Sequence, residues 1–365
     1  MKMKLFSDTA YALEGKMYVP LLYPFFGETE LEGSDLNVQP GRFRKYLEIA
    51  SNLFELTELE AADTAIYPIP WQLSKSPEGL ELADKFTEKV RQAGKKLVVF
   101  VGGDLNEDVT LKDAFIFHTS LYRSSLKPDT FAIPALIDDL VENYLEGQVN
   151  IRQKQEQPVV GFCGHAPPLG MSFSPKKVKE TVRLGFSYLG IDQLLAIKPA
   201  HSWRVKTLLN LSRSKLIKTN FDFKDHSGMI WAYGYLLKQE HLSNTQQHRK
   251  DFIQNMVNSD YIVCVRGYGN YSVRLYETLC CGRIPVFVNT DCVLPYDFSV
   301  NWKDYCVWIE EEEIPFVAEK ISDFHRSLSP QEFIELQHKC RRFWQQWLSP
   351  VGFFQNFYRH FSSNS

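Results

Sequence analysis

Apolar and polar positions in the last third of the chain form blocks that predict a strand, a turn, a helix and a second strand. Residues 261–265 are an apolar run, and residues 266–269 form a turn that contains two glycines. Apolar positions then recur at helical spacing over about residues 272–281, and Gly282 stands where a helix commonly ends in a left-handed residue. Residues 284–288 are again apolar. This order predicts two parallel strands joined by a right-handed helical crossover.

The turn of this unit is a candidate anion site. In such a crossover, the first turn brings backbone N–H groups and the positive end of the helix to the carboxyl edge of the sheet. Arg266 precedes the turn and Arg274 follows it, and two cations suit a diphosphate. Glu277 lies on the same helix face as Arg274, where its carboxylate suits the hydroxyls of a sugar. The competing interpretation is an i,i+3 ion pair between Arg274 and Glu277, worth about 0.2–0.5 kcal/mol on a solvated face.

Strand-like and helical patterns alternate along the rest of the chain, which predicts parallel α/β layers. In the first half, helical stripes cover residues 43–54 and 83–93, and strand-like runs cover residues 66–70 and 97–101. The polar stretch 147–158 is the candidate linker. A second series of strands is expected at residues 159–163, 216–219, 261–265, 284–288 and 305–309.

The end of the chain predicts a long amphipathic helix. Ser329 and Glu332 have the spacing of a capping box, and Pro330 occupies the first helical position. Apolar positions continue at helical spacing as far as Trp347. The expected organisation is therefore two α/β domains at residues 1–150 and 151–328, followed by a helical segment at residues 329–365.

Composition and charge limit the classes of function. At 365 residues the chain suits two domains, and 44% hydrophobic with 23% charged residues is typical of a folded globular protein. A net charge of −3 argues against a general nucleic-acid binder. Residues 176–224 nevertheless contain eleven Lys and Arg against three acids. This excess predicts attraction to a phosphorylated ligand or peripheral contact with an anionic membrane surface, with a solvated basic face as the alternative.

Targeting and metal-binding signals are not visible in the sequence. The first residues lack the sustained apolar core of a signal peptide, and no window approaches the ~20 apolar residues of a membrane span. The seven cysteines show no Cys-x-x-Cys spacing, which argues against zinc and fits buried reduced thiols in a cytoplasmic protein. No two aspartates are separated by a single residue. We therefore expect no metal and no bound cofactor.

The spacings of the crossover unit combine into one longer motif. The motif reads Arg-Gly, a short glycine-containing turn, Ser-x-Arg, Glu, a closing Gly and Ile-Pro-Val. Its residues here are Arg266, Gly267, Ser272, Arg274, Glu277, Gly282, Ile284, Pro285 and Val286. Leu294-Pro295-Tyr296 and then Trp302 follow. Over about residues 251–322 this pattern resembles the C-terminal half of the exostosin-like glycosyltransferases, glycosyltransferase family 47. The resemblance is weaker elsewhere.

The resemblance implies a GT-B fold, in which two Rossmann-like α/β domains face a cleft and the last helix packs back on the first domain. The acceptor would lie on the first domain and the nucleotide-sugar donor on the second. The implied reaction moves a sugar from a UDP-sugar to a glycan or glycolipid acceptor, with inversion and without a metal. Because eukaryotic members are typically membrane-anchored, the resemblance also implies a bacterial enzyme of polysaccharide biosynthesis, cytoplasmic or peripheral at the inner membrane surface.

Site residues follow from the same resemblance. Donor binding would involve Arg266, Gly267, Gly269, Ser272, Arg274 and Glu277, with Arg204 as an additional candidate from a partial match. His165 is a further candidate for contact with a donor phosphate or the acceptor, because of its position alone, in the Gly- and Pro-containing loop after the strand expected at residues 159–163. Asp104 follows an apolar strand where the family carries Arg-Asp-His-Phe, and the chain keeps the Asp without the His. Asp104 is therefore the candidate general base, with a helix N-cap as its competing role.

Two other functions remain open from the sequence. One is a fucosyltransferase-like GT-B enzyme that uses GDP-fucose, which would prefer guanine nucleotides. The other is a nucleotide- or glycan-binding protein without transferase activity, which the altered Arg-Asp-His motif keeps open. The sugar, the acceptor and the linkage have no readable signal in the sequence.

Overall fold

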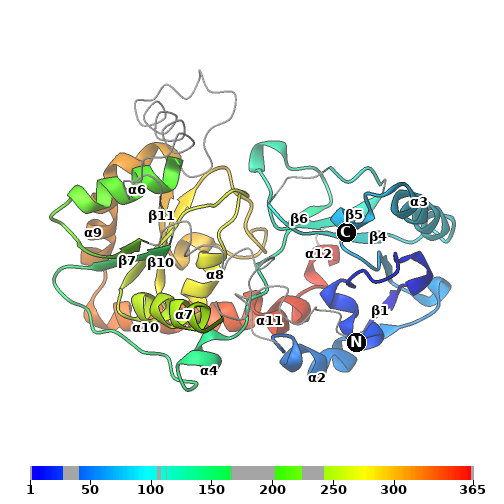
Figure 1. Ribbon diagram of the computed structural model, residues 1–365, viewed down its shortest axis with the longest axis horizontal. Helices are drawn as coiled ribbons and strands as arrows, with labels where there is room; N and C mark the ends of the chain where they lie inside the picture. The colour runs from blue at the N-terminus through cyan, green and yellow to red at the C-terminus, as the bar shows by residue number, and fades with distance from the viewer. Residues whose placement is uncertain are drawn as a thin grey trace.

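Two α/β units make up the protein, and Figure 1 shows them side by side. The structure is a computed structural model that describes residues 2–27, 41–104, 108–111, 113–164, 166, 202–223 and 242–362. Each unit contains one sheet in which all paired strands are parallel. The predicted α/β class with two parallel layers is confirmed.

The first unit is built on a six-stranded sheet with the order β2-β1-β3-β4-β5-β6. Its strands are β1 Met3–Phe6, β2 Phe54–Leu56, β3 Thr64–Ile66, β4 Leu97–Val101, β5 Ala114–His118 and β6 Thr130–Ala132. Alternate residues of β4 belong to different hydrophobic clusters: Val98 packs in the cluster that contains helix α2 (Arg44–Leu53), and Val99 in the cluster that contains α3 (Pro77–Gln92). Both faces of this sheet are therefore covered, as expected for parallel strands.

The second unit contains a five-stranded sheet with the order β11-β10-β9-β7-β8. Its strands are β7 Val159–Gly164, β8 Lys218–Phe223, β9 Tyr261–Cys264, β10 Ile284–Asn289 and β11 Val307–Glu310. The flanking helices include α6 Ser202–Arg213, α7 Leu242–Val257, α8 Val273–Cys280, α9 Val317–Ser327 and α10 Pro330–Phe343. Every residue of β9 is buried, and Gly282 has the predicted left-handed conformation at φ +64°.

The C-terminal segment connects the two units. Helix α10 begins with the predicted capping box and packs in the core of the second unit. A short π-helical turn, Trp344–Leu348, leads to α11 (Pro350–Gln355) and α12 (Arg359–Ser362), drawn in red beside the first unit in Figure 1. Phe353 and Phe357 join the core cluster of the first sheet. The expected return of the chain end to the first unit is confirmed, and α11 and α12 make it rather than α10.

The segment between the sheets is held to the second unit by buried polar contacts. Helix α4 (Leu140–Tyr144) contributes Leu140 to the second unit's core, although the predicted boundary at residue 150 assigned it to the first. Arg152 pairs with the buried Asp260, Nε to Oδ1, at 2.5 Å. The side chain of Gln337 on α10 bonds both the backbone N–H and the carbonyl of Arg152. Around Arg152, the stretch that was predicted to be a linker is therefore fixed to the second unit by an ion pair and hydrogen bonds.

Two further expectations from the sequence concern the cysteines and the helices. All seven cysteines are buried thiols, and none forms a disulfide. Burial raises the pKa of the Cys264 and Cys292 thiols to about 12, which makes them unreactive at neutral pH. Within the described ranges, no helix combines the length and the apolarity needed to cross a bilayer.

Candidate functional site

The turn that follows β9 lies at the carboxyl edge of the second sheet, as the sequence predicted. Helix α8 starts directly after it, with Ser272 in the N-cap position at φ −133° and ψ 111°. Ser272 makes no side-chain capping hydrogen bond. The first N–H groups of α8 and the positive end of its dipole therefore face this edge without a capping side chain.

Arg266 supports the turn from inside. Its Nη2 donates to the Tyr268 carbonyl at 2.7 Å, and its Nη1 donates to Asn270 Oδ1 at 3.2 Å. The guanidinium carbon lies 5.3 Å from the ring centroids of both Tyr122 and Trp203. The side chain is buried, so its positive charge is fixed at the edge of the sheet, and bulk water screens it weakly.

Arg274 reaches across to the end of the neighbouring strand β7. Its Nη2 donates to the Cys163 carbonyl at 2.5 Å, and its guanidinium lies 4.5 Å from the ring centroid of Phe162. Gly164 at the end of β7 has φ +146°, and a Cβ there would lie 2.8 Å from Arg274 Nη2. Glycine is therefore required at this position for both the backbone conformation and the space that the guanidinium occupies.

Glu277 is paired inside the protein rather than with Arg274. Its Oε1 accepts from Nη1 of Arg249 on α7 at 2.7 Å, and Nη2 of Arg249 lies 3.8 Å from Asp138 Oδ1. All three side chains are buried, and burial raises the pKa of the Asp138 carboxyl. Arg274 and Glu277 form no ion pair in the described part of the chain, so the surface-pair interpretation is wrong.

Arg204 joins the site from helix α6. Its Nη2 donates to the Arg266 carbonyl at 3.1 Å and would lie 3.6 Å from a Cβ at Gly267. The structure therefore brings Arg204, Arg266 and Arg274 to one edge from three separate segments. His165, the remaining predicted donor contact, lies outside the described residues. Most of the basic stretch 176–224 also falls outside them, and its ligand stays a prediction.

Asp104 lies against the turn from the first unit. A Cβ at Gly269 would come within 2.9 Å of both the Cα and the carbonyl oxygen of Asp104. Asp104 follows β4, and its segment is held by hydrogen bonds from Gly102 N–H to Gln72 Oε1 and from Thr119 Oγ1 to the Gly103 carbonyl. The predicted base and the predicted donor turn are thus neighbours across the contact between the units.

Asn270 is a central residue of this contact that the sequence did not indicate. Its side chain is buried and bonds Arg266, Thr290, Asp291 and the first-unit residue Leu121. No spacing signal was available, because these partners lie as far as 149 positions away in the chain. The same holds for Arg249, which meets Glu277 and Asp138 only in the fold.

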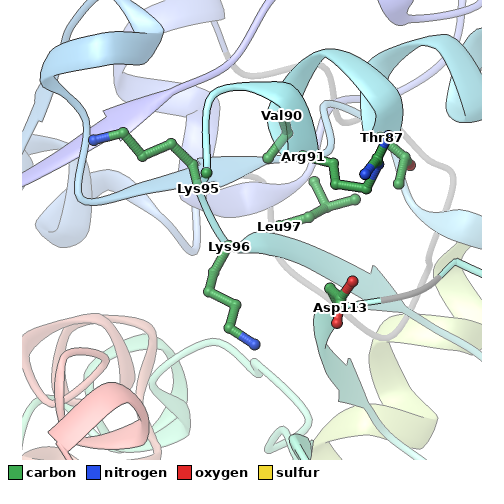
Figure 2. A pocket seen from close by; sticks show the side chains of 8 residues that line it. Thr87, Val90, Arg91, Lys95, Lys96, Leu97 and Asp113 are labelled. Atoms are coloured by element: carbon green, nitrogen blue, oxygen red, sulfur yellow. The ribbon is translucent and has the colours of Figure 1, made fainter.

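A separate pocket of about 280 Å³ lies at the opposite end of β4, and Figure 2 shows its lining. It is lined by Thr87, Val90, Arg91, Gly94, Lys95, Lys96, Leu97 and Asp113. The cations of this pocket have protein partners: Arg91 bonds Glu88, and Lys95 donates to the Ala62 carbonyl. The pocket is far from the turn along β4, and we assign it no role in the site.

Among the residues that the structure describes, no three His, Cys, Asp or Glu side chains gather as a metal-binding group. The positive charge at the edge of the second sheet comes instead from guanidinium groups. Their partners include backbone carbonyls and the Asn270 amide.

Comparison with known proteins finds one segment that is similar to a family. Residues 236–323 match the family model described as the exostosin GT47 domain, and this segment contains the turn and α8. The chain is 30% identical over 71 residues to the probable beta-1,4-xylosyltransferase IRX10L of Arabidopsis thaliana, covering 20% of this chain and 17% of that protein. It is 25% identical over 108 residues to Exostosin-1 of Drosophila melanogaster, covering 30% and 14% respectively. The match thus spans less than a fifth of either relative.

Two solved structures are distantly similar to the chain. TarM has a TM-score of 0.30 at 11% identity, covering 78% of this chain and 58% of that one. A glycosyltransferase from Rickettsia africae ESF-5 has a TM-score of 0.36 at 12% identity and covers both chains fully. These values are too low to transfer any residue or role.

Proposed function

We propose that the protein transfers a sugar from a nucleotide-sugar donor to a glycan acceptor. The match of residues 236–323 to the exostosin GT47 domain supports this proposal. The observation that carries the proposal is the meeting of Arg204, Arg266 and Arg274 at the edge where α8 begins. A nucleoside diphosphate carries its negative charge on two adjacent phosphates. Fixed guanidinium groups together with helix N–H groups complement such a group in shape and charge.

In the proposed reaction, a hydroxyl oxygen of the acceptor attacks the anomeric carbon of the donor sugar. The bond between this carbon and the diphosphate oxygen breaks, and its electron pair leaves with the diphosphate. Arg266 and Arg274 stabilise the charge that develops there, since preorganised donors act most strongly where charge appears in the transition state. The configuration at the anomeric carbon is inverted, because attack and departure occur on opposite faces.

We assign the hydroxyl proton to Asp104. Its backbone lies against Gly269 of the donor turn, so its carboxylate is on the acceptor side of the same site. A positioned base of this kind contributes about 10²–10⁴ in rate. Glu277 would bind the ribose through Oε2, because its Oε1 already accepts from Arg249.

The donor is proposed to be a UDP-sugar, used without a metal. The test is a thermal-shift titration of the protein with UDP, GDP, CDP and ADP in the presence of EDTA, on wild type, Arg274→Ala and Arg326→Ala. Arg326 is an exposed arginine paired with Asp323 on α9 and serves as the matched control. UDP alone should raise Tm in wild type and in Arg326→Ala, and should fail to do so in Arg274→Ala.

Other outcomes of this titration change the assignment. Stabilisation by GDP alone would replace the UDP-sugar with GDP-fucose as the donor. Stabilisation that appears only without EDTA would contradict metal independence. The absence of any shift with all four nucleotides would contradict the transferase proposal itself.

A further inference from the structure

The side chain of Asn270 uses its full hydrogen-bonding capacity although it is only 1% exposed. Its Oδ1 accepts from Thr290 Oγ1 at 2.8 Å and from Arg266 Nη1 at 3.2 Å. Its Nδ2 donates to the carbonyls of Leu121 at 2.9 Å and Asp291 at 3.2 Å. An amide offers two donors and two acceptor sites, so no other side chain of this size reproduces the set.

These bonds connect the two units to each other. Leu121 belongs to the loop after β5 in the first unit, and the neighbouring Ser120 accepts the backbone N–H of Asn270 on its Oγ at 2.8 Å. Ser120 itself is fully buried. The turn of the second unit is therefore attached to the first unit at the residue that also holds Arg266.

Arg266 depends on this attachment for its orientation. Its Nη2 is fixed by the Tyr268 carbonyl within the turn, while its Nη1 is fixed by Asn270. If the first unit moved away, Asn270 would lose Ser120 and Leu121, and the second anchor of the guanidinium would loosen with it. The position of a phosphate-binding arginine is thereby tied to the contact between the units.

We propose that Asn270 is a positioning residue that couples the contact between the two units to the orientation of Arg266. The inference rests on the proposed function, because it gives Arg266 a phosphate to bind. It goes further by assigning this coupling to one amide and by predicting that first-unit residues without ligand contact tune nucleotide affinity. Ser120, which accepts the backbone N–H of Asn270, is such a residue.

The test compares four variants of the full chain by calorimetric titration with UDP, together with Tm measured without nucleotide. Asn270→Ala removes the whole amide, and Ser120→Ala removes only the first-unit acceptor. Asn270→Asp keeps an acceptor for Arg266 but places an oxygen against the Leu121 and Asp291 carbonyls. Ser124→Ala is the control, because Ser124 Oγ binds the Asp291 carboxylate across the same contact at 2.5 Å, whereas Asn270 binds the Asp291 carbonyl.

The Kd for UDP should rise about tenfold or more in Asn270→Ala, as for loss of a hydrogen bond to a charged group. Asn270→Asp should not restore wild-type affinity, and Ser120→Ala should weaken binding to a smaller extent. Ser124→Ala should lower Tm while its Kd stays within about twofold of wild type. If the Asn270→Ala protein does not fold, the order of Ser120→Ala and Ser124→Ala still decides the question.

Two results would overturn the inference in distinguishable ways. Equal Kd values for wild type, Ser120→Ala and both Asn270 variants, with binding lost in Arg274→Ala, would remove the coupling and leave the proposed function standing. Full affinity in Asn270→Asp would show that the contact with the first unit is dispensable. Failure of wild type to bind UDP or any other nucleoside diphosphate would reject the proposed function, and the inference with it.

Discussion

The carboxyl edge of the second sheet presents guanidinium groups, whereas the described loops beside it on the first unit present backbone groups, the Thr119 hydroxyl and Asp104. Arg204, Arg266 and Arg274 come from three segments and bond backbone carbonyls at or beside the turn. On the first unit, the N–H of Gly102 donates to Gln72 and the carbonyl of Gly103 accepts from Thr119, next to Asp104. Under the proposed function, this difference assigns the charge of the leaving group to the second unit and the proton of the acceptor to the first.

The two units also differ in how they are held. The second is braced by buried ion pairs around its helices, such as Arg341 with Asp139 at 2.7 Å. The first is covered by aromatic rings of the returning chain end, among them Phe353 and Phe357. The ring centroids of His360 on α12 and Phe117 lie 4.8 Å apart in this aromatic region. We therefore expect changes to charged residues to destabilise mainly the second unit, and the titration of His360 to destabilise the first.

The largest expected effect comes from removing the proposed base. Asp104→Asn preserves the shape of the side chain but accepts no proton, so turnover should fall by about 10²–10⁴. The affinity for UDP should stay within about twofold, because the phosphate-binding groups belong to the other unit. Transfer rate and Kd are measured on the same preparation. Unchanged turnover would show that the first unit supplies a different base, or that Asp104 has no part in the chemistry.

Acidification should weaken the first unit through His360. Burial lowers the pKa of His360 to about 4, below the ordinary 6.5. Between these values the unfolded chain binds the proton and the folded chain does not, so stability is full above about pH 6.5 and falls toward pH 4. The loss approaches about 3 kcal/mol. Urea titrations of wild type and His360→Gln from pH 7 to 4.5 measure it, and parallel pH profiles for the two proteins would contradict the assignment.

A smaller effect is expected when Gly164, which lies beside Arg274, is replaced by a larger residue. Gly164→Ala places a Cβ 2.8 Å from Arg274 Nη2 at φ +146°, which should cost about 1–3 kcal/mol of stability and weaken UDP binding. Gly15→Ala is the control, because Gly15 has φ +69° and nothing within 4 Å of the added Cβ. The control should lose about 1–2 kcal/mol without a change in Kd. Equal Kd values for both variants would mean that the Arg274 position does not matter for the ligand.

The crossover unit of the site was readable from the sequence because local rules dominate there. Strand β9 is apolar at every position, α8 has a helical stripe, and Gly282 ends it with the predicted positive φ. Strands β1, β2, β5 and β6 were not predicted, and two of them, β2 and β6, have only three residues, too few to show a strand period. Their pairing is decided by the rest of the sheet.

The parts of the site that depend on long-range contacts could not be predicted. Arg249 meets Glu277 from 28 positions away and Asp138 meets Arg249 from 111 positions away, and each looks like an ordinary surface charge in the sequence. The polarity of residues 147–158 predicted a linker, but Arg152 is matched to Asp260 in the fold. Polar character alone does not distinguish a solvated linker from a segment whose charged side chains have buried partners.

The most direct test of the donor site is a crystal structure of the full chain with UDP. The account predicts that the diphosphate lies at the start of α8, with its oxygens within about 3.2 Å of guanidinium nitrogens of Arg266 and Arg274. The uridine would extend toward Glu277. A diphosphate bound elsewhere, such as in the pocket beside Lys95 and Lys96, would contradict the claim that this turn is the donor site.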